Sequence, residues 1–228
     1  GFEAERLVSG ARSAVAETVG ALPEEIYFTS GGTFGDNLAL LGAARRNKKR
    51  GRHIIISSIE HSAVENAAKR LEDSEGFEVS RIPPDSSGHI GARDVAAAVR
   101  KDTVLVSVML VNNELGTVQP VKEISEAVRQ INADTLLHTD AVQAYTKIKT
   151  DVRELGVDMM TMSGHKIHAL KGTGAVYIKK GTKIEPLIYG GGQESGLAPG
   201  TEPVPGILSF AAAARAAFAA AGGEKEEK

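Results

Sequence analysis

Five short polar stretches of the chain carry side chains that could bind a charged ligand or move a proton. Each one follows an apolar run of strand length. In open parallel sheets, ligands bind beyond the carboxyl ends of the strands. We therefore expect the five stretches to meet at one edge of a sheet and to form a ligand site there. They are Ser30–Thr33, Ser57–His61, Asn112–Glu114, Asp140–Gln143 and Ser163–Lys166.

The first stretch, Ser30-Gly31-Gly32-Thr33, lies between a predicted strand and a predicted helix. Glycines let backbone N–H groups come close to an anion, and the positive end of a helix dipole favours negative charge. The pattern is therefore typical of a phosphate cradle, to which Thr33 adds a hydroxyl donor. It is as typical of a tight strand-to-helix turn in which Thr33 caps the helix.

Lys166 follows Ser163-Gly164-His165 at the end of another predicted strand. Most lysines near loops are solvated surface residues. A lysine in a desolvated site, with a depressed pKa, is instead a nucleophile for carbonyl compounds. Its position at a strand end, beside a phosphate cradle, favours the nucleophile.

Four further side chains suit an aromatic, cationic ligand, and each also has an ordinary structural explanation. Asp140 could cap a helix or bind a cationic ring nitrogen, and Gln143 would share its face if a helical turn follows. His61 could stack on an aromatic ring and shuttle protons, or could be a capping or core histidine. Asn113 could donate to a phenolic oxygen, although taken alone it is more typical of a turn residue.

The elements that would position these groups alternate along the chain. Several strand candidates are continuous apolar runs, which is typical of strands buried on both faces, and the helix candidates between them repeat near 3.6 residues. This alternation predicts an α/β fold with a mostly parallel seven-stranded sheet flanked by helices. The predicted strands are Ile26–Thr29, His53–Ser57, Phe77–Ile82, Thr103–Met109, Thr135–Thr139, Asp158–Met162 and Gly174–Ile178. The predicted helices are Glu3–Val19, Gly35–Asn47, Ser62–Asp73, Ala92–Arg100, Val121–Ile131 and 204–221.

Composition narrows the classes of function. The 228 residues carry a net charge of −2, which gives no reason to expect a nucleic-acid or membrane partner. The basic run at residues 45–50 is interpreted as a solvated turn, and no histidine spacing indicates a metal site. No secretory signal opens the chain, so a cytoplasmic location is expected. The chain contains no cysteine, so it can supply neither a disulfide nor a thiol nucleophile.

Six motifs, in order and at matching spacing, give the chain a specific resemblance. It resembles the large domain of the NifS-like cysteine desulfurases, in the class V aminotransferase group of enzymes that use pyridoxal phosphate (PLP), which implies the type I PLP-dependent transferase fold. The motifs are Phe28-Thr29-Ser30-Gly31-Gly32-Thr33 with Asp36-Asn37; Glu60-His61-Ser62; Val111-Asn112-Asn113-Glu114-Leu115-Gly116; His138-Thr139-Asp140-Ala141-Val142-Gln143; Ser163-Gly164-His165-Lys166 with Lys171-Gly172; and Gly190-Gly191-Gly192-Gln193-Glu194.

The resemblance implies a role for each candidate. Lys166 would hold PLP as a Schiff base and Asp140 would pair with the pyridine nitrogen, while His61 would stack on the ring. Gln143 and Asn113 would bond the phenolic oxygen. Residues implied to bind the phosphate are Gly32, Thr33, Ser163 and His165, together with Thr201 from a second subunit, so that a homodimer is implied.

The chain departs from the family pattern at three places. Phe34-Gly35 stands where the family usually has Glu-Ala, and Ala169-Leu170 stands where it has Gly-Pro. Ala198-Pro199 stands where it has Arg-Ser, which removes a positive charge near the cofactor and the dimer contact. We expect residues 1–221 to form the PLP-binding large domain and residues 222–228 a charged tail. The family's N-terminal segment and its C-terminal small domain, which carries the substrate-binding arginine and the sulfur-accepting cysteine, are expected to be absent.

These expectations leave three functions open. The first is desulfuration of L-cysteine to alanine for iron–sulfur cluster assembly, incomplete in this chain because the acceptor cysteine would come from another segment or an acceptor protein. The second is another class V reaction, such as that of a selenocysteine lyase or an aminotransferase, which needs no enzyme thiol. The third is a truncated domain that binds PLP without catalysis.

Overall fold

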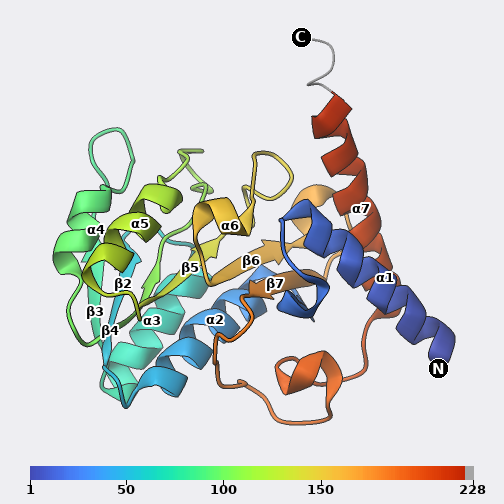
Figure 1. The fold of residues 1–228 in the computed structure, drawn as a ribbon, viewed down its shortest axis with the longest axis horizontal. Helices are drawn as coiled ribbons and strands as arrows, with labels where there is room; N and C mark the ends of the chain where they lie inside the picture. The colour runs from blue at the N-terminus through green and yellow to red at the C-terminus, as the bar shows by residue number, and fades with distance from the viewer. Residues whose placement is uncertain (224–228) are drawn as a thin grey trace.

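A single twisted sheet of seven strands forms the centre of the molecule (Figure 1). The computed structural model describes residues 1–223, with the backbone alone for 221–223. The strand order is β1-β7-β6-β5-β4-β2-β3, and only β7 runs antiparallel to its neighbours. The predicted mostly parallel α/β sheet is confirmed. The strands are β1 (Ile26–Thr29), β2 (His53–Ser57), β3 (Glu78–Ile82), β4 (Thr103–Ser107), β5 (Leu136–Asp140), β6 (Met159–Ser163) and β7 (Gly174–Ile178).

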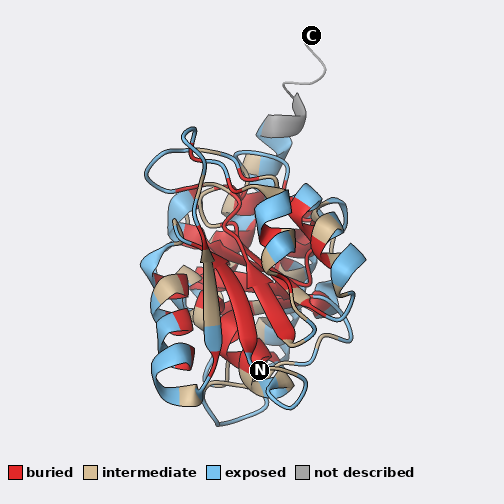
Figure 2. Ribbon diagram, turned by 90° about the vertical axis from the view of Figure 1, so that its left-hand side faces the viewer, coloured by how far each residue is buried: buried red, intermediate tan, exposed pale blue. Residues whose placement is uncertain are grey.

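The central strands are buried along their whole length, as their apolar runs predict. Every residue of β2, β4, β6 and β7 is buried, and the strands lie between layers of partly exposed helices (Figure 2). The predicted strand Thr103–Met109 is too long, since β4 ends at Ser107. Its continuation still lies against β5, because the N–H groups of Val108 and Leu110 donate to carbonyls of β5, but without regular strand pairing.

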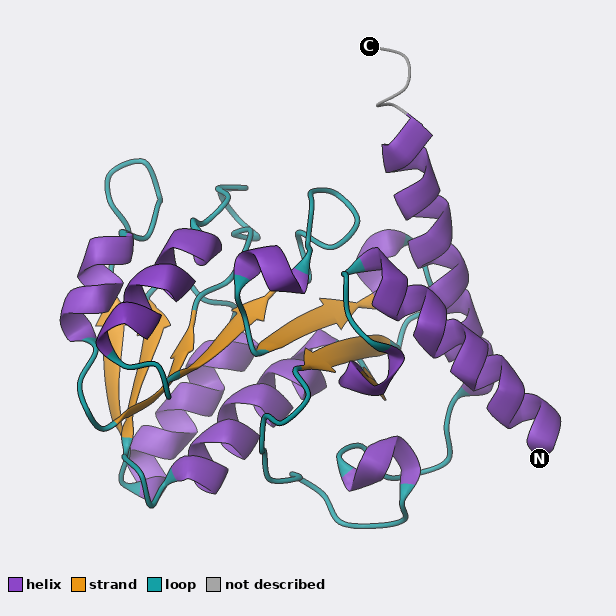
Figure 3. Ribbon diagram, viewed as in Figure 1, coloured by secondary structure: helices purple, strands orange, loops and turns teal. Residues whose placement is uncertain are grey.

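Helices cover both faces of the sheet (Figure 3). Helices α2 and α3 enclose one apolar core, and the other helices enclose a second. The four-residue helix α6 was not predicted, because one turn is too short to show a helical period. Of the predicted tail, residues 222 and 223 continue the last helix, and the rest lies outside the described residues. The helices are α1 (Phe2–Thr18), α2 (Gly32–Asn47), α3 (Ser62–Glu75), α4 (Ala92–Ala98), α5 (Val121–Ile131), α6 (Val152–Leu155) and α7 (Val204–Gly223).

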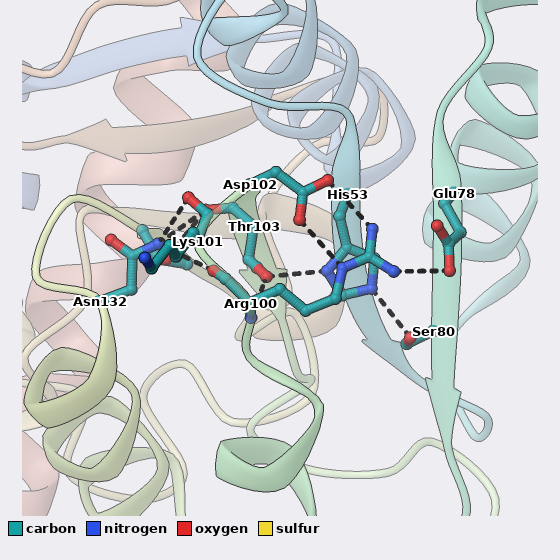
Figure 4. Close-up of polar contacts among 9 residues, drawn as sticks. His53, Glu78, Ser80, Arg100, Lys101, Asp102, Thr103 and Asn132 are labelled. Carbon is teal, nitrogen blue, oxygen red and sulfur yellow. Dashed lines mark hydrogen bonds and ion pairs between the residues drawn. The ribbon is translucent and has the colours of Figure 1, made fainter.

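A polar network joins strands β2, β3 and β4 at or near their amino ends (Figure 4). The imidazole of His53 is fully buried and has a partner on each nitrogen, the hydroxyls of Thr103 and Ser80, at 2.8 and 2.9 Å. Burial, and then the positive charge of Arg100, lowers the pKa of His53 and favours the neutral ring. Arg100 is held in turn by Glu78 at 2.7 Å and by Asp102 at 2.9 Å. Among the described residues, no buried side-chain oxygen or nitrogen of this network lacks a hydrogen-bond partner, so the network holds the three strands together.

Among residues 1–223, no helix is both long enough and apolar enough to cross a membrane.

Candidate active site at the carboxyl end of the sheet

A cleft of about 420 Å³ lies where the polar stretches follow their strands. The structure therefore brings together the five stretches that the sequence places at the carboxyl ends of strands. Asp36, Met109 and Val111 also line the cleft, and the sequence analysis assigned them no role. Nine of the ten predicted site residues line it: Gly32, Thr33, His61, Asn113, Asp140, Gln143, Ser163, His165 and Lys166.

One wall of the cleft is the amino terminus of α2. Gly31 is the N-cap, no side chain caps the helix, and the first turn holds no acidic residue. Thr33 lies inside the helix, so the alternative that Thr33 caps it is wrong. A Cβ on Gly32 would lie 2.8 Å from Cγ2 of Val142, so only glycine fits there without displacing that side chain. Uncapped N–H groups at a helix amino terminus are suited to an anion.

His61 caps a helix and also lines the cleft, so its capping role is observed while its role toward a ligand stays a prediction. It is the N-cap of α3, and its Nδ1 accepts a hydrogen bond from the N–H of Ala63 at 3.1 Å. It also lines the cleft, with its side chain exposed. Because Nδ1 is an acceptor, the proton of the neutral ring is on Nε2. Capping thus holds the imidazole in one orientation at the wall of the cleft.

The turn after β4 depends on Asn112 and leaves Asn113 free for a ligand. The Asn112 side chain accepts from the N–H groups of Glu114 and Leu115 at 2.9 and 2.8 Å and donates to the carbonyl of Ile59 at 3.0 Å. Asn113 is exposed and lines the cleft. Asn113 lies in the turn, as its structural alternative holds, but the side chain that fixes the turn is that of Asn112.

Asp140 is the last residue of β5 and is almost completely buried. Its Oδ1 accepts from the N–H of Val142 at 2.8 Å, which fixes the carboxyl at the start of the following turn. Burial raises the pKa of Asp140, while the bond from Val142 and the nearby His61 oppose that shift. Gln143 lines the same cleft, as its predicted position on the face of Asp140 requires.

Lys166 lies in a short 3₁₀ turn, Gly164–Ile167, directly after β6. Its side chain is exposed, and within residues 1–223 its ammonium makes no hydrogen bond or ion pair. Beside it, the hydroxyl of Ser163 and Nδ1 of His165 are 2.8 Å apart. Burial and the positive charges of Lys166 and Lys171 lower the pKa of His165. A primary amine without a partner, facing an anion cradle, is equipped to react with an aldehyde-bearing phosphate ester.

Two carboxyls for which no role was predicted lie near Asp140: Asp36, which is buried and lines the cleft, and Glu60, which is half-buried and lines a neighbouring pocket. Asp36 is 1% exposed, and one oxygen each from Asp36 and Asp140 and a ring nitrogen of His61 lie within 4.8 Å of one another. Burial and the Asp140 carboxylate raise the pKa of Asp36 well above its usual range. Burial raises the pKa of Glu60 to about 8. The sequence feature that could have indicated Asp36 is an acidic residue in a largely apolar stretch of helix, one turn after Gly32.

The tenth predicted residue, Thr201, lies outside this cleft. It is exposed and lines a neighbouring cavity of about 200 Å³, together with Pro199 and Ile188. The loop that carries it is anchored by Glu194, whose two oxygens each accept from Arg12 at 2.7 Å. That Thr201 completes the phosphate site of a second subunit stays a prediction. Arg12 and Glu194 are 182 residues apart in sequence, so no local pattern could predict that they pair.

The chain matches one family description and is similar to curated proteins. The family description "Aminotransferase class-V" matches residues 1–228. The chain is 45% identical over 214 residues to the protein named cysteine desulfurase IscS 1 of Archaeoglobus fulgidus, which covers 94% of this chain and 55% of that protein.

Solved structures show the same likeness. The structure named NifS-like protein matches with a TM-score of 0.93 and 44% identity, over 96% of this chain and 60% of the other. The structure titled SspA in complex with cysteine matches with a TM-score of 0.89 and 42% identity, over 93% of this chain and 61% of the other. The chain spans about half the length of the curated relatives it matches.

Proposed function

Because the chain belongs to the class-V aminotransferase family, we propose that the cleft binds pyridoxal phosphate and that the chain is the cofactor-binding part of a cysteine desulfurase. One observation carries the proposal. A lysine without a partner, a buried carboxyl and an uncapped helix amino terminus line a single cleft. These are the three groups that an aldehyde, a ring nitrogen and a phosphate require.

The residues of the cleft fit this cofactor. No side chain caps the first turn of α2, which leaves N–H groups from Gly32 onward for a phosphate, and the bonded Ser163–His165 pair lines the same cleft and can add a side-chain donor. At the other end, the Asp36 and Asp140 carboxyls are buried and form no ion pair with an arginine or lysine of residues 1–223, which suits a cationic ring. The cleft has a volume of about 420 Å³, which leaves room for a small aromatic ligand.

The chain's own side chains then have separate tasks. Lys166 would hold the cofactor through Nζ and would afterwards be a free amine next to the substrate. Asp140 would hold the ring nitrogen, and Asn113 and Gln143 the phenolic oxygen. His61, fixed by its bond to Ala63, would cover the ring face with Nε2 available to carry a proton. When bound, the cofactor supplies an electron sink for carbanion chemistry on an amino acid.

Removal of sulfur from L-cysteine is the reaction that the named relatives favour. Sulfur must pass to a thiolate as alanine forms, and this chain has no cysteine. The acceptor would therefore be a cysteine of another segment or of an acceptor protein, such as one that delivers sulfur to iron–sulfur clusters. We also propose a homodimer, because Thr201 is exposed and lines a neighbouring cavity instead of its own cleft, so that it could complete the phosphate site of a second copy.

An absorption spectrum tests the cofactor proposal. The purified chain with added PLP should develop the visible band of a lysine-bound cofactor, and Lys166→Ala should remove it. Lys183→Ala, which changes an exposed lysine that lines neither cavity, should leave the band unchanged. No band at saturating PLP would refute the proposal. A band that L-cysteine alters without sulfide release, with a thiol acceptor present, would favour a lyase or an aminotransferase instead.

A further inference from the structure

Three carboxyls lie close to one another at the carboxyl end of the sheet, two of them in the wall of the cleft, and none has an arginine or lysine partner among the described residues. They are Asp36 on α2, Glu60 in the turn after β2, and Asp140 at the end of β5. Within residues 1–223 no arginine or lysine forms an ion pair with any of them. Burial of charge without a partner is unfavourable, so a cluster of this kind must lose charge or gain a cation.

Two of the buried oxygens have no hydrogen-bond partner at all. Of the buried side-chain oxygens and nitrogens in the described part of the chain, only Oδ1 of Asp36 and Oε2 of Glu60 lack one. The other oxygen of Glu60 is satisfied, by the Ser57 hydroxyl at 2.6 Å and the N–H of Met109 at 2.8 Å. A carboxylate oxygen buried without a donor is costly, whereas a protonated carboxyl can itself donate.

The groups that face Asp36 from the surrounding elements do not neutralise it. From β5, Nε2 of His138 lies 3.7 Å from Oδ1 of Asp36, but burial lowers the pKa of His138 to about 3 and keeps the ring neutral. From β6, the Thr161 hydroxyl lies 3.0 Å from that same nitrogen, and its interaction with Asp36 opposes the rise in the pKa of Asp36 without outweighing burial. The remaining titratable groups that face it are Glu60, His61 and Asp140, with Lys166 across the same cleft.

We propose that Asp36 is a positioning residue that carries a proton in the folded chain, so that the Asp36–Asp140 pair bears one negative charge. A single charge matches the single positive charge of a protonated ring nitrogen. The proton on Asp36 also provides a donor for the neighbouring Asp140 carboxylate, which weakens Asp140 as a base and leaves the proton on the ring. The consequence for the cofactor rests on the proposed function, whereas the location of the proton does not.

Infrared spectroscopy of the chain without cofactor tests where the proton is. The spectrum of the wild type minus that of Asp36→Asn, at neutral pH, should show the carbonyl stretch of a protonated carboxylic acid that shifts in deuterated water. Asp158→Asn is the matched control, because Asp158 is also buried but is bound by Arg129 at 2.9 Å, and it should remove carboxylate intensity only. If Asp36→Asn removes a carboxylate band, or if the acid band disappears with Asp140→Asn and not with Asp36→Asn, the proposal is wrong.

A measurement on the unchanged sequence covers the case in which Asp36→Asn fails to fold. In a chain labelled with carbon-13 at the aspartate carboxyls, one signal should still be protonated at neutral pH. It should broaden or shift when PLP is added, because the pair lines the cleft. Aspartate signals that are all ionised at neutral pH would refute the proton assignment whether or not PLP binds.

Cofactor affinity tests the positioning role. Asparagine keeps a neutral donor at position 36, so Asp36→Asn should bind PLP within about threefold of the wild type, while Asp36→Leu, which leaves Asp140 without that donor, should bind at least about tenfold more weakly. Equal losses in the two variants would show that the negative charge of Asp36 is what matters and would overturn the proposal. A chain that shows the acid band but binds no PLP would contradict the proposed function and leave the proton assignment standing.

Discussion

Two buried aspartates lie at opposite ends of neighbouring strands and differ in how their charge is met. Asp158, just before β6, accepts from Arg129 and from the N–H of Leu137, both at 2.9 Å. Asp140, at the end of β5, accepts from one backbone N–H, and the titratable groups within 4.8 Å of it are the Asp36 carboxyl and the His61 ring. The bonds of Asp158 hold elements of the fold together. Asp140 has no cationic partner among the described residues, so a cationic ligand can supply one.

The polar groups at the two ends of the sheet differ in the same way. At the amino end of the sheet, the network of Figure 4 holds His53 and Arg100, and within residues 1–223 no buried side-chain oxygen or nitrogen of it lacks a partner. At the carboxyl end, two buried oxygens have no partner, and Lys166 makes no polar contact among the described residues. Buried polar groups that lack a hydrogen-bond partner tend to occur at functional sites. The difference therefore indicates which end of the sheet carries chemistry.

The largest expected effect is a pH dependence that arises at the carboxyl end. A carboxyl with a raised folded-state pKa stabilises the fold fully below its unfolded value, and this contribution is lost as the pH rises through the folded value. For Glu60 the window runs from its ordinary 4.5 to about 8. In urea unfolding of the chain without cofactor, Glu60 should therefore lower the free energy of unfolding by about 1.4 kcal/mol per pH unit inside this window, up to about 5 kcal/mol in all.

Glu60→Gln should remove that share of the pH dependence, because glutamine does not titrate. Glu114→Gln is the control, because Glu114 is exposed and lines the same small pocket as Glu60, and its curve should follow the wild type. A Glu60→Gln curve parallel to the wild type would mean that the carboxyl is charged in the folded chain, and the contrast between the two ends of the sheet would fail.

A matched pair of substitutions compares the two ends directly. Asp158→Asn should lower the free energy of unfolding by about 2 kcal/mol, because Arg129 and a buried N–H lose a charged acceptor while partial exposure of Arg129 limits the loss. Asp140→Asn should cost nothing or stabilise the chain, because it removes a carboxylate next to Asp36 and keeps an acceptor for Val142. Equal losses in urea unfolding would remove the distinction between structural and functional aspartates.

The smallest effect is expected at the exposed rim of the amino-end network. Arg100→Ala removes bonds to Glu78 and Asp102, but the Arg100 side chain is 39% exposed, so the loss should be no more than about 1 kcal/mol and should shrink in high salt. PLP binding should be unchanged, since Arg100 does not line the cleft. A loss of PLP affinity would show that the two ends of the sheet are coupled.

The sequence predicts most of this architecture because the relevant signals are local. Continuous apolar runs such as Ile54-Ile55-Ile56 mark strands buried on both faces, and the polar residues that follow them mark the edge where ligands bind. The antiparallel direction of β7 has no such signal, because it depends on which strands pair. The helix α6 is hidden for a different reason, since four residues cannot show a period.

The site was predicted less completely than the fold, for a physical reason. Residues directly after strands, such as Lys166 and Asp140, follow from position alone. Asp36 reaches the same cleft from inside α2, so its importance depends on which strand the helix packs against. The anchoring of the Thr201 loop by Arg12 and Glu194 likewise depends on tertiary contact between distant segments.

The most direct test of the central claim, that Lys166 holds the cofactor, is chemical trapping. Borohydride reduction of the chain with PLP would fix the cofactor to the amine that bears it, and peptide mass spectrometry would locate the added mass. We expect one pyridoxyl group per chain, on the peptide that contains Lys166, and none at Lys183 on the surface. Label on another lysine, label spread over surface lysines, or no label at saturating PLP would contradict the account.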